Sequence, residues 1–365
     1  MKVPFVDLVA WAKPSREEYL AAFAQVLDTG AFVGGPQVAS FEAAFAKFCG
    51  AQHAIALNNG TDALLLALRA LGVGPGDEVI TAANSFFATA EAISHAGAKP
   101  VLVDVDDATL LLDLDAAMKH VTAKTKVVIP VHLFGQLCDM ERVRAFANQF
   151  ELRVLEDSAQ AHGATRGGFR AGSAGDAAAF SFYPTKNLGA IGEGGAVTTS
   201  DPIIAESVRR LRDHGQAGRH DHVDIAYNAR LDSVQCACLE ISLRRLAAAN
   251  EVRRARAARY RARLGNAVRF VGEAPDSAPV YHLMIVRVDA AKRDAIRDAL
   301  GKAGVATAIH YPTPIHRQRA YADLKQPPCP VAERAAAEMI SLPMFPDLTA
   351  DQVDYVCEQL ITVLR

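Results

Sequence analysis

The stretch that decides the fold reads Ala178-Ala179-Phe180-Ser181-Phe182-Tyr183-Pro184-Thr185-Lys186-Asn187-Leu188-Gly189, and the glycine-rich segment Ile191-Gly192-Glu193-Gly194-Gly195 follows it. Its apolar, aromatic first half predicts a buried strand, which proline and glycine then end. Lys186 lies between that proline and that glycine. Because it follows a buried strand directly, its ammonium group can lose solvation, which lowers the pKa of the amine and makes it a nucleophile. Lys186 therefore suits the formation of a Schiff base.

An acidic residue, Asp157, favours a Schiff-base role for Lys186 over the alternative that Lys186 is a solvated surface lysine. It stands in Val154-Leu155-Glu156-Asp157-Ser158-Ala159-Gln160-Ala161-His162-Gly163, just after another short apolar strand. Both side chains are thus expected at one edge of a parallel sheet, where α/β proteins bind ligands. A carboxylate that keeps a pyridine nitrogen protonated, beside a lysine that holds an aldehyde carbon, suits pyridoxal 5'-phosphate (PLP). We therefore predict a PLP site with Lys186 and Asp157 as catalytic residues.

The composition is that of an ordinary enzyme. The chain has 365 residues, of which 50% are hydrophobic and 22% charged, and a net charge of −2. This length suits two domains, and the balanced charge favours neither nucleic acid nor an anionic membrane as a partner. No apolar segment resembles a signal peptide, and no run is long enough to span a bilayer. We therefore expect a cytoplasmic enzyme.

Cysteines and arginines give no further site. The six cysteines form no C-x-x-C pair and have no histidine at metal-ligand spacing, so no metal site is predicted. Cys236 and Cys238 are interpreted as small buried residues of a helix. The basic run 253–259 is interpreted as the solvated surface of a helix rather than a nucleic-acid contact.

Strand and helix patterns alternate along the chain. Helices are expected at 15–28, 37–49, 62–71, 86–95, 139–149, 201–212, 232–264, 291–303 and 349–363. Strands are expected at 54–57, 77–81, 100–104, 126–131, 152–156 and 281–288. This order predicts an α/β fold with a mostly parallel sheet covered on both faces.

Two short segments before residue 90 add candidate cofactor contacts. The turn Asn58-Asn59-Gly60-Thr61 joins a strand to a helix, so its N–H groups and the Thr61 hydroxyl predict a phosphate cradle. A simple N-cap is the alternative. Phe86 and Phe87 come next to one another at the start of the next helix, so they cannot face the same way. Phe87 is expected in the core.

These motifs resemble the DegT/DnrJ/EryC1/StrS family of PLP-dependent nucleotide-sugar aminotransferases, from Val3-Pro4-Phe5-Val6-Asp7-Leu8 to the C-terminus. The resemblance implies aminotransferase fold type I, with a large PLP-binding domain over 1–245 and a smaller α+β domain over 246–365. It implies that Phe86 stacks on the pyridine ring, Gln160 lies near its 3-hydroxyl group and Ser181 binds the phosphate. The loop 30–36 would lie near the active site and the partner subunit.

A homodimer with shared active sites is also implied by the resemblance. In the segment Tyr227-Asn228-Ala229-Arg230 the asparagine, Asn228, would reach the cofactor phosphate of the other subunit. Two residues depart from the family pattern here, because Tyr227 replaces a usual glycine and Arg219-His220 replaces a usual Lys-Tyr pair. Because of these two departures, the resemblance does not assign substrate contacts to this loop.

Several polar residues have two interpretations. The loop Ala308-Ile309-His310-Tyr311-Pro312-Thr313-Pro314-Ile315-His316 is stiffened by proline, and its polar side chains either contact a polar ligand or stabilise the loop itself. His310, Tyr311 and His316, with Tyr183, are the candidate substrate contacts. His132, in Val131-His132-Leu133-Phe134-Gly135-Gln136, is either structural or part of the pocket.

The function implied by the resemblance is amino transfer from L-glutamate to a keto-sugar nucleotide. The substrate implied is a dTDP-3-keto-6-deoxyhexose, which would become a dTDP-3-amino-3,6-dideoxyhexose. A 4-keto-sugar nucleotide is the alternative substrate, and a non-catalytic PLP-binding regulatory protein is the alternative class. A PLP-dependent sugar dehydratase is disfavoured because such relatives carry histidine in place of Lys186. A dinucleotide-binding oxidoreductase is disfavoured because residues 192–195 do not match G-x-G-x-x-G.

Overall fold

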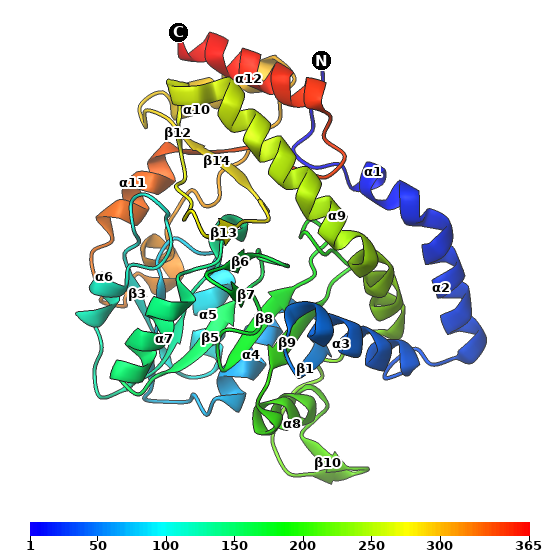
Figure 1. The fold of residues 1–365 in the computed structure, drawn as a ribbon. Helices are drawn as coiled ribbons and strands as arrows, with labels where there is room; N and C mark the ends of the chain where they lie inside the picture. The colour runs from blue at the N-terminus through cyan, green and yellow to red at the C-terminus, as the bar shows by residue number, and fades with distance from the viewer.

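The computed structural model describes residues 1–365, and its centre is a seven-stranded sheet (Figure 1). The strand order is β1-β9-β8-β5-β4-β2-β3. The strands are β1 (His53–Leu57), β2 (Glu78–Ala82), β3 (Lys99–Val103), β4 (Thr125–Ile129), β5 (Arg153–Asp157), β8 (Ala177–Ser181) and β9 (Gly195–Thr199). Only β9 pairs antiparallel with its neighbours. The predicted mostly parallel sheet is therefore confirmed.

Helices cover both faces of this sheet. Alternate side chains of a strand point to opposite faces, and β8 shows this division. Ala177 and Ala179 join a cluster of 63 buried residues that includes the apolar side of the helix Gly60–Ala70, whereas Phe180 joins a second cluster with Phe41 and Phe45 of the helix Pro36–Cys49. The helices around the sheet are α3 (Pro36–Cys49), α4 (Gly60–Ala70), α5 (Phe87–His95), α6 (Leu114–Met118), α7 (Met140–Gln149) and α8 (Pro202–Arg212).

The long helix α9 (Ser233–Leu264) leads away from the sheet to the C-terminal part of the fold (Figure 1). There β12 (Arg269–Phe270), β14 (Met284–Arg287) and β15 (Met339–Leu342) form an antiparallel sheet. With α10 (Arg293–Lys302) and α12 (Ala350–Leu364) it encloses a separate cluster of 19 buried residues. Val3 belongs to this cluster and pairs with Val305. We keep the domain boundary near residue 245 as a proposal, with Val3 packing on the C-terminal side.

The basic run on α9 is not simply solvated, so that interpretation was wrong in part. The Arg253 side chain is buried and donates to the carbonyl oxygens of Tyr281 and Met344, both at 3.0 Å. Arg256 donates to the Leu348 carbonyl at 2.6 Å. These arginines satisfy backbone carbonyls of the C-terminal part, which periodicity alone could not indicate.

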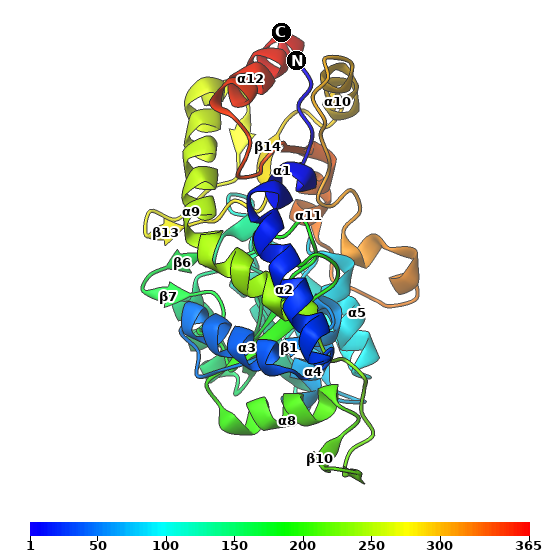
Figure 2. The same cartoon turned by 90° about the vertical axis from the view of Figure 1, so that its right-hand side faces the viewer.

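The remaining elements lie at the edges of the fold. They are α1 (Leu8–Ala12), α2 (Arg16–Thr29), α11 (Pro330–Glu338) and the short strands β6 (Thr165–Arg166), β7 (Phe169–Arg170), β10 (Gln216–Gly218), β11 (Asp221–His222) and β13 (Ser277–Ala278). The segment with β10 and β11 projects from the body of the molecule (Figure 2). None of the helices combines the length and apolar character that crossing a membrane requires. A cytoplasmic location stays a prediction.

Candidate active site

A cavity of about 420 Å³ opens at the carboxyl ends of β5 and β8. Most of the residues that the sequence singled out line it. These are Gly60, Thr61, Phe86, Asp157, Gln160, Ser181, Tyr183, Lys186, His310 and Tyr311. The same wall also includes Thr89, Glu193 and His282, which sequence reasoning did not select. Asn228 and His316 are not part of the lining.

Lys186 lies in a tight turn after β8. Its N–H donates to the Tyr183 carbonyl at 2.8 Å, and the turn then needs Gly189, where a Cβ atom would lie 2.5 Å from the Pro184 carbonyl oxygen. The Nζ atom makes no hydrogen bond or ion pair within the chain. Burial lowers the pKa of Lys186 from 10.5 to about 8, and the nearby charge of Asp157 opposes part of that change. The site thus holds a free amine that is partly neutral near pH 8.

Asp157 is the last residue of β5, directly beside β8 in a parallel pair. Its Oδ2 atom accepts from the Thr89 hydroxyl at 2.7 Å, and its Oδ1 atom accepts from the Ala159 N–H at 3.2 Å. Its backbone carbonyl accepts from His132 N–H at 3.0 Å. The carboxylate is buried and still lines the cavity. It is therefore fixed in place, with its charge available to a group inside.

The start of α4 offers unpaired donors to the cavity. Asn59 caps the helix by accepting from Asp62 N–H at 2.8 Å, while the N–H groups of Gly60 and Thr61 donate no hydrogen bond within the chain. A Cβ atom on Gly60 would lie 2.5 Å from the Cβ atom of Ser181. Glycine is thus required for the helix end to approach β8. The helix begins two residues before the predicted start at Asp62, so both free N–H groups belong to its first turn.

The glycines 192–195 have a packing role. A Cβ atom on Gly195 would lie 2.3 Å from the Asn59 carbonyl oxygen, so this position lets β9 pass close to the turn before α4. A Cβ atom on Gly192 would meet the Gln235 side chain at 2.9 Å. Gly195 therefore lets two backbone segments approach beside the cavity, and Gly192 leaves room for the Gln235 side chain.

Two aromatic rings of the cavity lining contact each other. The Phe86 ring, half exposed, lies with its centroid 5.4 Å from that of Tyr311. The Tyr311 hydroxyl accepts from Gln160 Nε2 at 3.1 Å, and Gln160 Oε1 accepts from Phe134 N–H at 2.7 Å. Phe87 packs instead against the large core, as predicted.

The polar loop 308–316 divides into two parts. His310 lines the cavity, stacks on Phe5 with ring centroids 5.7 Å apart, and contacts Ser341 Oγ through Nδ1 at 2.8 Å. Burial, helped by the nearby charge of Lys186, lowers the pKa of His310 to about 4, so its ring is neutral at pH 7. His316 instead contacts Glu333 at 2.9 Å, away from the cavity.

His132 belongs to the structure beneath the site. Its Nδ1 atom accepts from Cys138 N–H at 3.2 Å, so its Nε2 atom carries the proton and donates to Glu156 at 2.9 Å. Both side chains are fully buried. Glu156 also accepts three backbone N–H groups, those of residues 172, 174 and 175. Because this network precedes Asp157 directly, it anchors the end of β5.

Asn228 lies on the surface, where its Oδ1 atom accepts from Arg230 Nε at 3.1 Å. Arg219 and His220 are exposed in the turn between β10 and β11. The segment from 216 to 228 thus contributes nothing to the cavity of its own chain.

The geometry agrees with the comparisons to known proteins. The model of the DegT/DnrJ/EryC1/StrS aminotransferase family matches residues 14–361. The chain belongs to this family. Three curated relatives are each 43% identical to it. They are a "Pleiotropic regulatory protein" of Geobacillus stearothermophilus (100% of this chain, 99% of the relative), a UDP-N-acetyl-3-dehydro-alpha-D-glucosamine 3-aminotransferase of Acidithiobacillus ferrooxidans (100% and 97%) and a dTDP-3-amino-3,4,6-trideoxy-alpha-D-glucose transaminase of Streptomyces venezuelae (96% and 93%).

A solved structure has the same fold over the whole chain. It is DesV of S. venezuelae, described as a complex with a ketimine intermediate, with a TM-score of 0.97 and 43% identity. The alignment covers 100% of this chain and 99% of DesV. The predicted fold class and the recognition of the family are therefore confirmed.

Proposed function

We propose that this aminotransferase uses PLP to move an amino group from L-glutamate to a nucleotide-linked keto sugar. The observation that carries the proposal is the pair formed by Lys186 and Asp157. A free amine with a lowered pKa and a fixed carboxylate emerge side by side from adjacent parallel strands into one cavity. PLP needs this combination of groups.

The rest of the cavity fits PLP as well. The unpaired N–H groups of Gly60 and Thr61, with the Ser181 hydroxyl, would hold the phosphate at the positive end of the α4 dipole. Asp157 would meet the pyridine nitrogen and Phe86 the face of the ring. When bound, PLP supplies an electron sink for the carbon atom that bears the amino group.

Lys186 is the base placed to carry the proton that amino transfer requires. Its pKa of about 8 leaves part of the amine neutral near pH 7, so Nζ can accept a proton from one carbon and return it to another. Asp157 contributes a fixed negative charge, whose hydrogen bond to a protonated ring nitrogen would be worth about 1.5–3 kcal/mol. Tyr183, His310 and Tyr311 would orient the sugar.

The proposed acceptor is a dTDP-3-keto-6-deoxyhexose that is aminated at C3. Support comes from the S. venezuelae relative, which is named for a dTDP-3-amino sugar, and from the A. ferrooxidans relative, which is named a 3-aminotransferase. The A. ferrooxidans relative, at the same identity, is named for a UDP-linked sugar, so a UDP-linked 3-keto sugar is the competing substrate to be tested. Choosing C3 over C4 requires a shift of the hexose by about one carbon–carbon bond, which polar contacts from His310 and Tyr311 could set.

We also propose a homodimer with shared sites. Asn228 lies outside its own cavity, as a residue that serves the partner subunit would. One face of α2 exposes Leu20, Phe23 and Leu27, and Phe32 and Val33 of the nearby glycine loop are exposed beside it. Apolar side chains gathered in this way are typical of a subunit interface.

The decisive test compares kcat/KM for dTDP-3-keto-6-deoxyglucose, dTDP-4-keto-6-deoxyglucose and a UDP-linked 3-keto sugar, with L-glutamate as donor. The proposal predicts the highest value for the dTDP-3-keto sugar. A clear preference for the 4-keto sugar would refute C3 amination and leave the PLP mechanism standing. Failure of every keto sugar, while PLP still binds, would favour the regulatory alternative, to which the name of the G. stearothermophilus relative points.

A further inference from the structure

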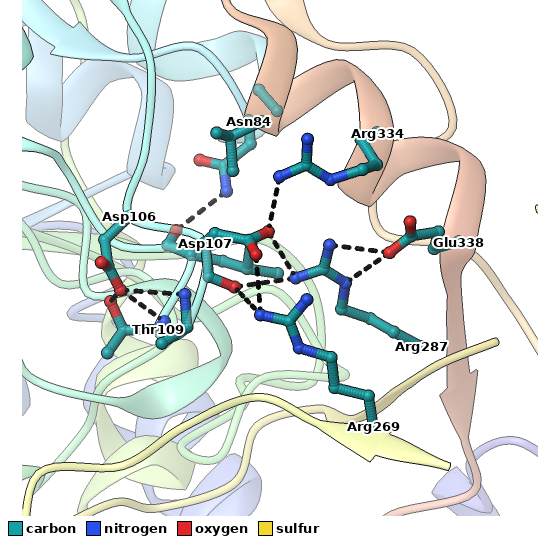
Figure 3. Close-up of polar contacts among 12 residues, drawn as sticks. Asn84, Asp106, Asp107, Thr109, Arg269, Arg287, Arg334 and Glu338 are labelled. Carbon is teal, nitrogen blue, oxygen red and sulfur yellow. Dashed lines mark hydrogen bonds and ion pairs between the residues drawn. The ribbon is translucent and has the colours of Figure 1, made fainter. Parts of the chain in front are cut away.

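One aspartate outside the cavity gathers three arginines. Asp107 lies in the loop after β3, and its Oδ1 atom meets Arg334 at 3.0 Å and Arg287 at 2.9 Å (Figure 3). Its Oδ2 atom meets Arg269 at 2.8 Å. The backbone carbonyl of Asp107 also accepts from Arg269 at 2.9 Å and from Arg287 at 2.8 Å.

The three arginines come from three elements of the C-terminal part. Arg269 is on β12, Arg287 on β14 and Arg334 on α11. Arg287 is buried, with 2% of its side chain exposed, and it is also held by Glu338 at 2.7 Å. Removing a partner of a buried guanidinium group is costly, because it leaves the charge without compensation. The loop of Asp107 is thus fixed to the C-terminal sheet.

Neighbouring contacts strengthen the same junction. Asp104 accepts from the N–H groups of Val331 and Ala332, both at 2.9 Å, and so caps the start of α11. The Gly272 N–H donates to the Ala108 carbonyl at 2.7 Å. Residues 104–108 therefore form a loop that contacts β12, β14 and α11.

The same loop is also connected by a hydrogen bond to the segment that carries two of the residues lining the cavity. Asp106 accepts from Thr109 through both its N–H and its hydroxyl, which holds the loop in shape. The carbonyl of Leu110, in that same loop, accepts from Asn84 Nδ2 at 2.9 Å (Figure 3). Asn84 is buried and directly precedes Ser85 and Phe86, which line the cavity.

Two further residues of the cavity lining, His282 and Tyr311, belong to the C-terminal part. His282 lies just before β14, the strand that ends in Arg287. Tyr311, whose ring is 5.4 Å from that of Phe86, lies in a segment whose Ile315 N–H donates to the Ala83 carbonyl at 2.8 Å. The loop of Asp107 thus contacts both the strand behind His282 and the turn that carries Phe86.

We propose that Asp107 is a positioning residue, which sets the spacing between Phe86 and the two lining residues of the C-terminal part, His282 and Tyr311. This inference rests on the proposed function, because the spacing matters for holding the keto-sugar nucleotide. Asp107 is not part of the cavity lining. Its loss is expected to weaken sugar binding while Asp157, at the end of β5, and Lys186, in the turn after β8, keep their geometry.

The test uses Asp107→Asn, which removes the charge and keeps the backbone carbonyl contacts. The matched control is Asp354→Asn, because Asp354 also binds two arginines, Arg259 and Arg263, but within the C-terminal part alone. Asp107→Asn should raise KM for the keto-sugar nucleotide about threefold to tenfold, with kcat within about twofold. Added salt should bring the KM values of the Asp107→Asn and Asp354→Asn enzymes closer together. The reason is that the Asp354→Asn enzyme keeps the partly exposed ion pairs of Asp107, and salt ions screen those pairs.

A second measurement does not depend on turnover. Hydrogen–deuterium exchange in residues 83–89 should become faster in Asp107→Asn and stay unchanged in Asp354→Asn. A purely structural role would loosen β12 and β14 and leave residues 83–89 as they were. If Asp107→Asn does not fold, Arg334→Gln removes a single, half-exposed partner and should shift KM and exchange in the same direction.

The outcomes separate this inference from the proposed function. Unchanged KM and unchanged exchange at 83–89, in an enzyme that aminates keto-sugar nucleotides, would overturn the role of Asp107 alone. Absence of turnover in the unmodified protein would overturn the proposed function. In that case the exchange measurement still shows whether Asp107 holds the turn of Phe86.

Discussion

The Thr89 hydroxyl donates to Asp157 Oδ2 at 2.7 Å and lies 2.8 Å from Ser85 Oγ. An ionised carboxylate only accepts hydrogen bonds, so the proton of Thr89 points to Asp157 and that of Ser85 points to Thr89. This chain of hydroxyl groups fixes one oxygen of the carboxylate that the proposed chemistry needs. Thr89 is therefore a positioning residue for Asp157.

Thr89→Val should lower kcat for glutamate-dependent amino transfer about 10-fold to 100-fold. The reason is that a hydrogen bond to a charged group, worth about 1.5–3 kcal/mol, is lost while the shape of the side chain is kept. Thr89→Ser keeps the donor and should stay near the unmodified enzyme. Steady-state kinetics give kcat for both variants. A Thr89→Val enzyme with kcat within twofold of the unmodified enzyme would argue against the positioning role of Thr89.

Lys186→Met should stabilise the cofactor-free protein at pH 7 by about 1–3 kcal/mol, because a buried ammonium group is removed. Between pH 8 and 10.5 the unfolded chain still holds the proton that folded Lys186 has released. Stability of the original protein therefore rises through this window, and the advantage of Lys186→Met shrinks. Urea unfolding at pH 7 and pH 10 measures both values. Lys325→Met, at an exposed position, should show no such pH-dependent difference.

The polar loop should divide functionally as it divides in space. Tyr311→Phe removes the hydroxyl that meets Gln160 in the cavity and should raise KM for the sugar nucleotide about fivefold to tenfold. His316→Gln alters only the contact with Glu333 and should leave KM within twofold. Equal effects of both changes on KM would show that the loop acts as a unit.

Much of this site could be predicted from the sequence because its main parts follow strands. Asp157 ends one short apolar strand and Lys186 lies in the turn after another, and adjacent parallel strands bring such positions to one edge. Thr89 and His282 could not be found in this way. Thr89 lies inside a helix and His282 before a strand of the C-terminal sheet, so only the three-dimensional packing brings them to the cavity.

Contacts between residues distant in sequence also explain why the positions of Arg253 and His316 differ from those predicted. The pattern around Arg253 is that of a surface helix, and its burial follows from the docking of the C-terminal part onto α9. His316 shares its loop with His310, yet the loop turns it toward Glu333 on α11. A local pattern gives the type of side chain available, and long-range contacts decide where that side chain points.

Mixing subunits should test the role of Asn228. In a hybrid of Lys186→Ala and Asn228→Ala chains, one of the two sites combines an original lysine with an original asparagine from the partner. Random mixing should therefore restore about a quarter of the original activity, although each variant alone is inactive or weak. If hybrids form, as native mass spectrometry can show, and activity does not return, Asn228 acts within its own chain.

The attachment point of PLP tests the account most directly. Borohydride reduction of the PLP-loaded protein, followed by proteolysis and peptide mapping, should place the pyridoxyl group on Lys186, the lysine that combines a lowered pKa with a place in the cavity. Lys186→Ala should lose this label and keep its fold. A pyridoxyl group on another lysine, or no label in protein that binds PLP, would contradict the assignment of the site.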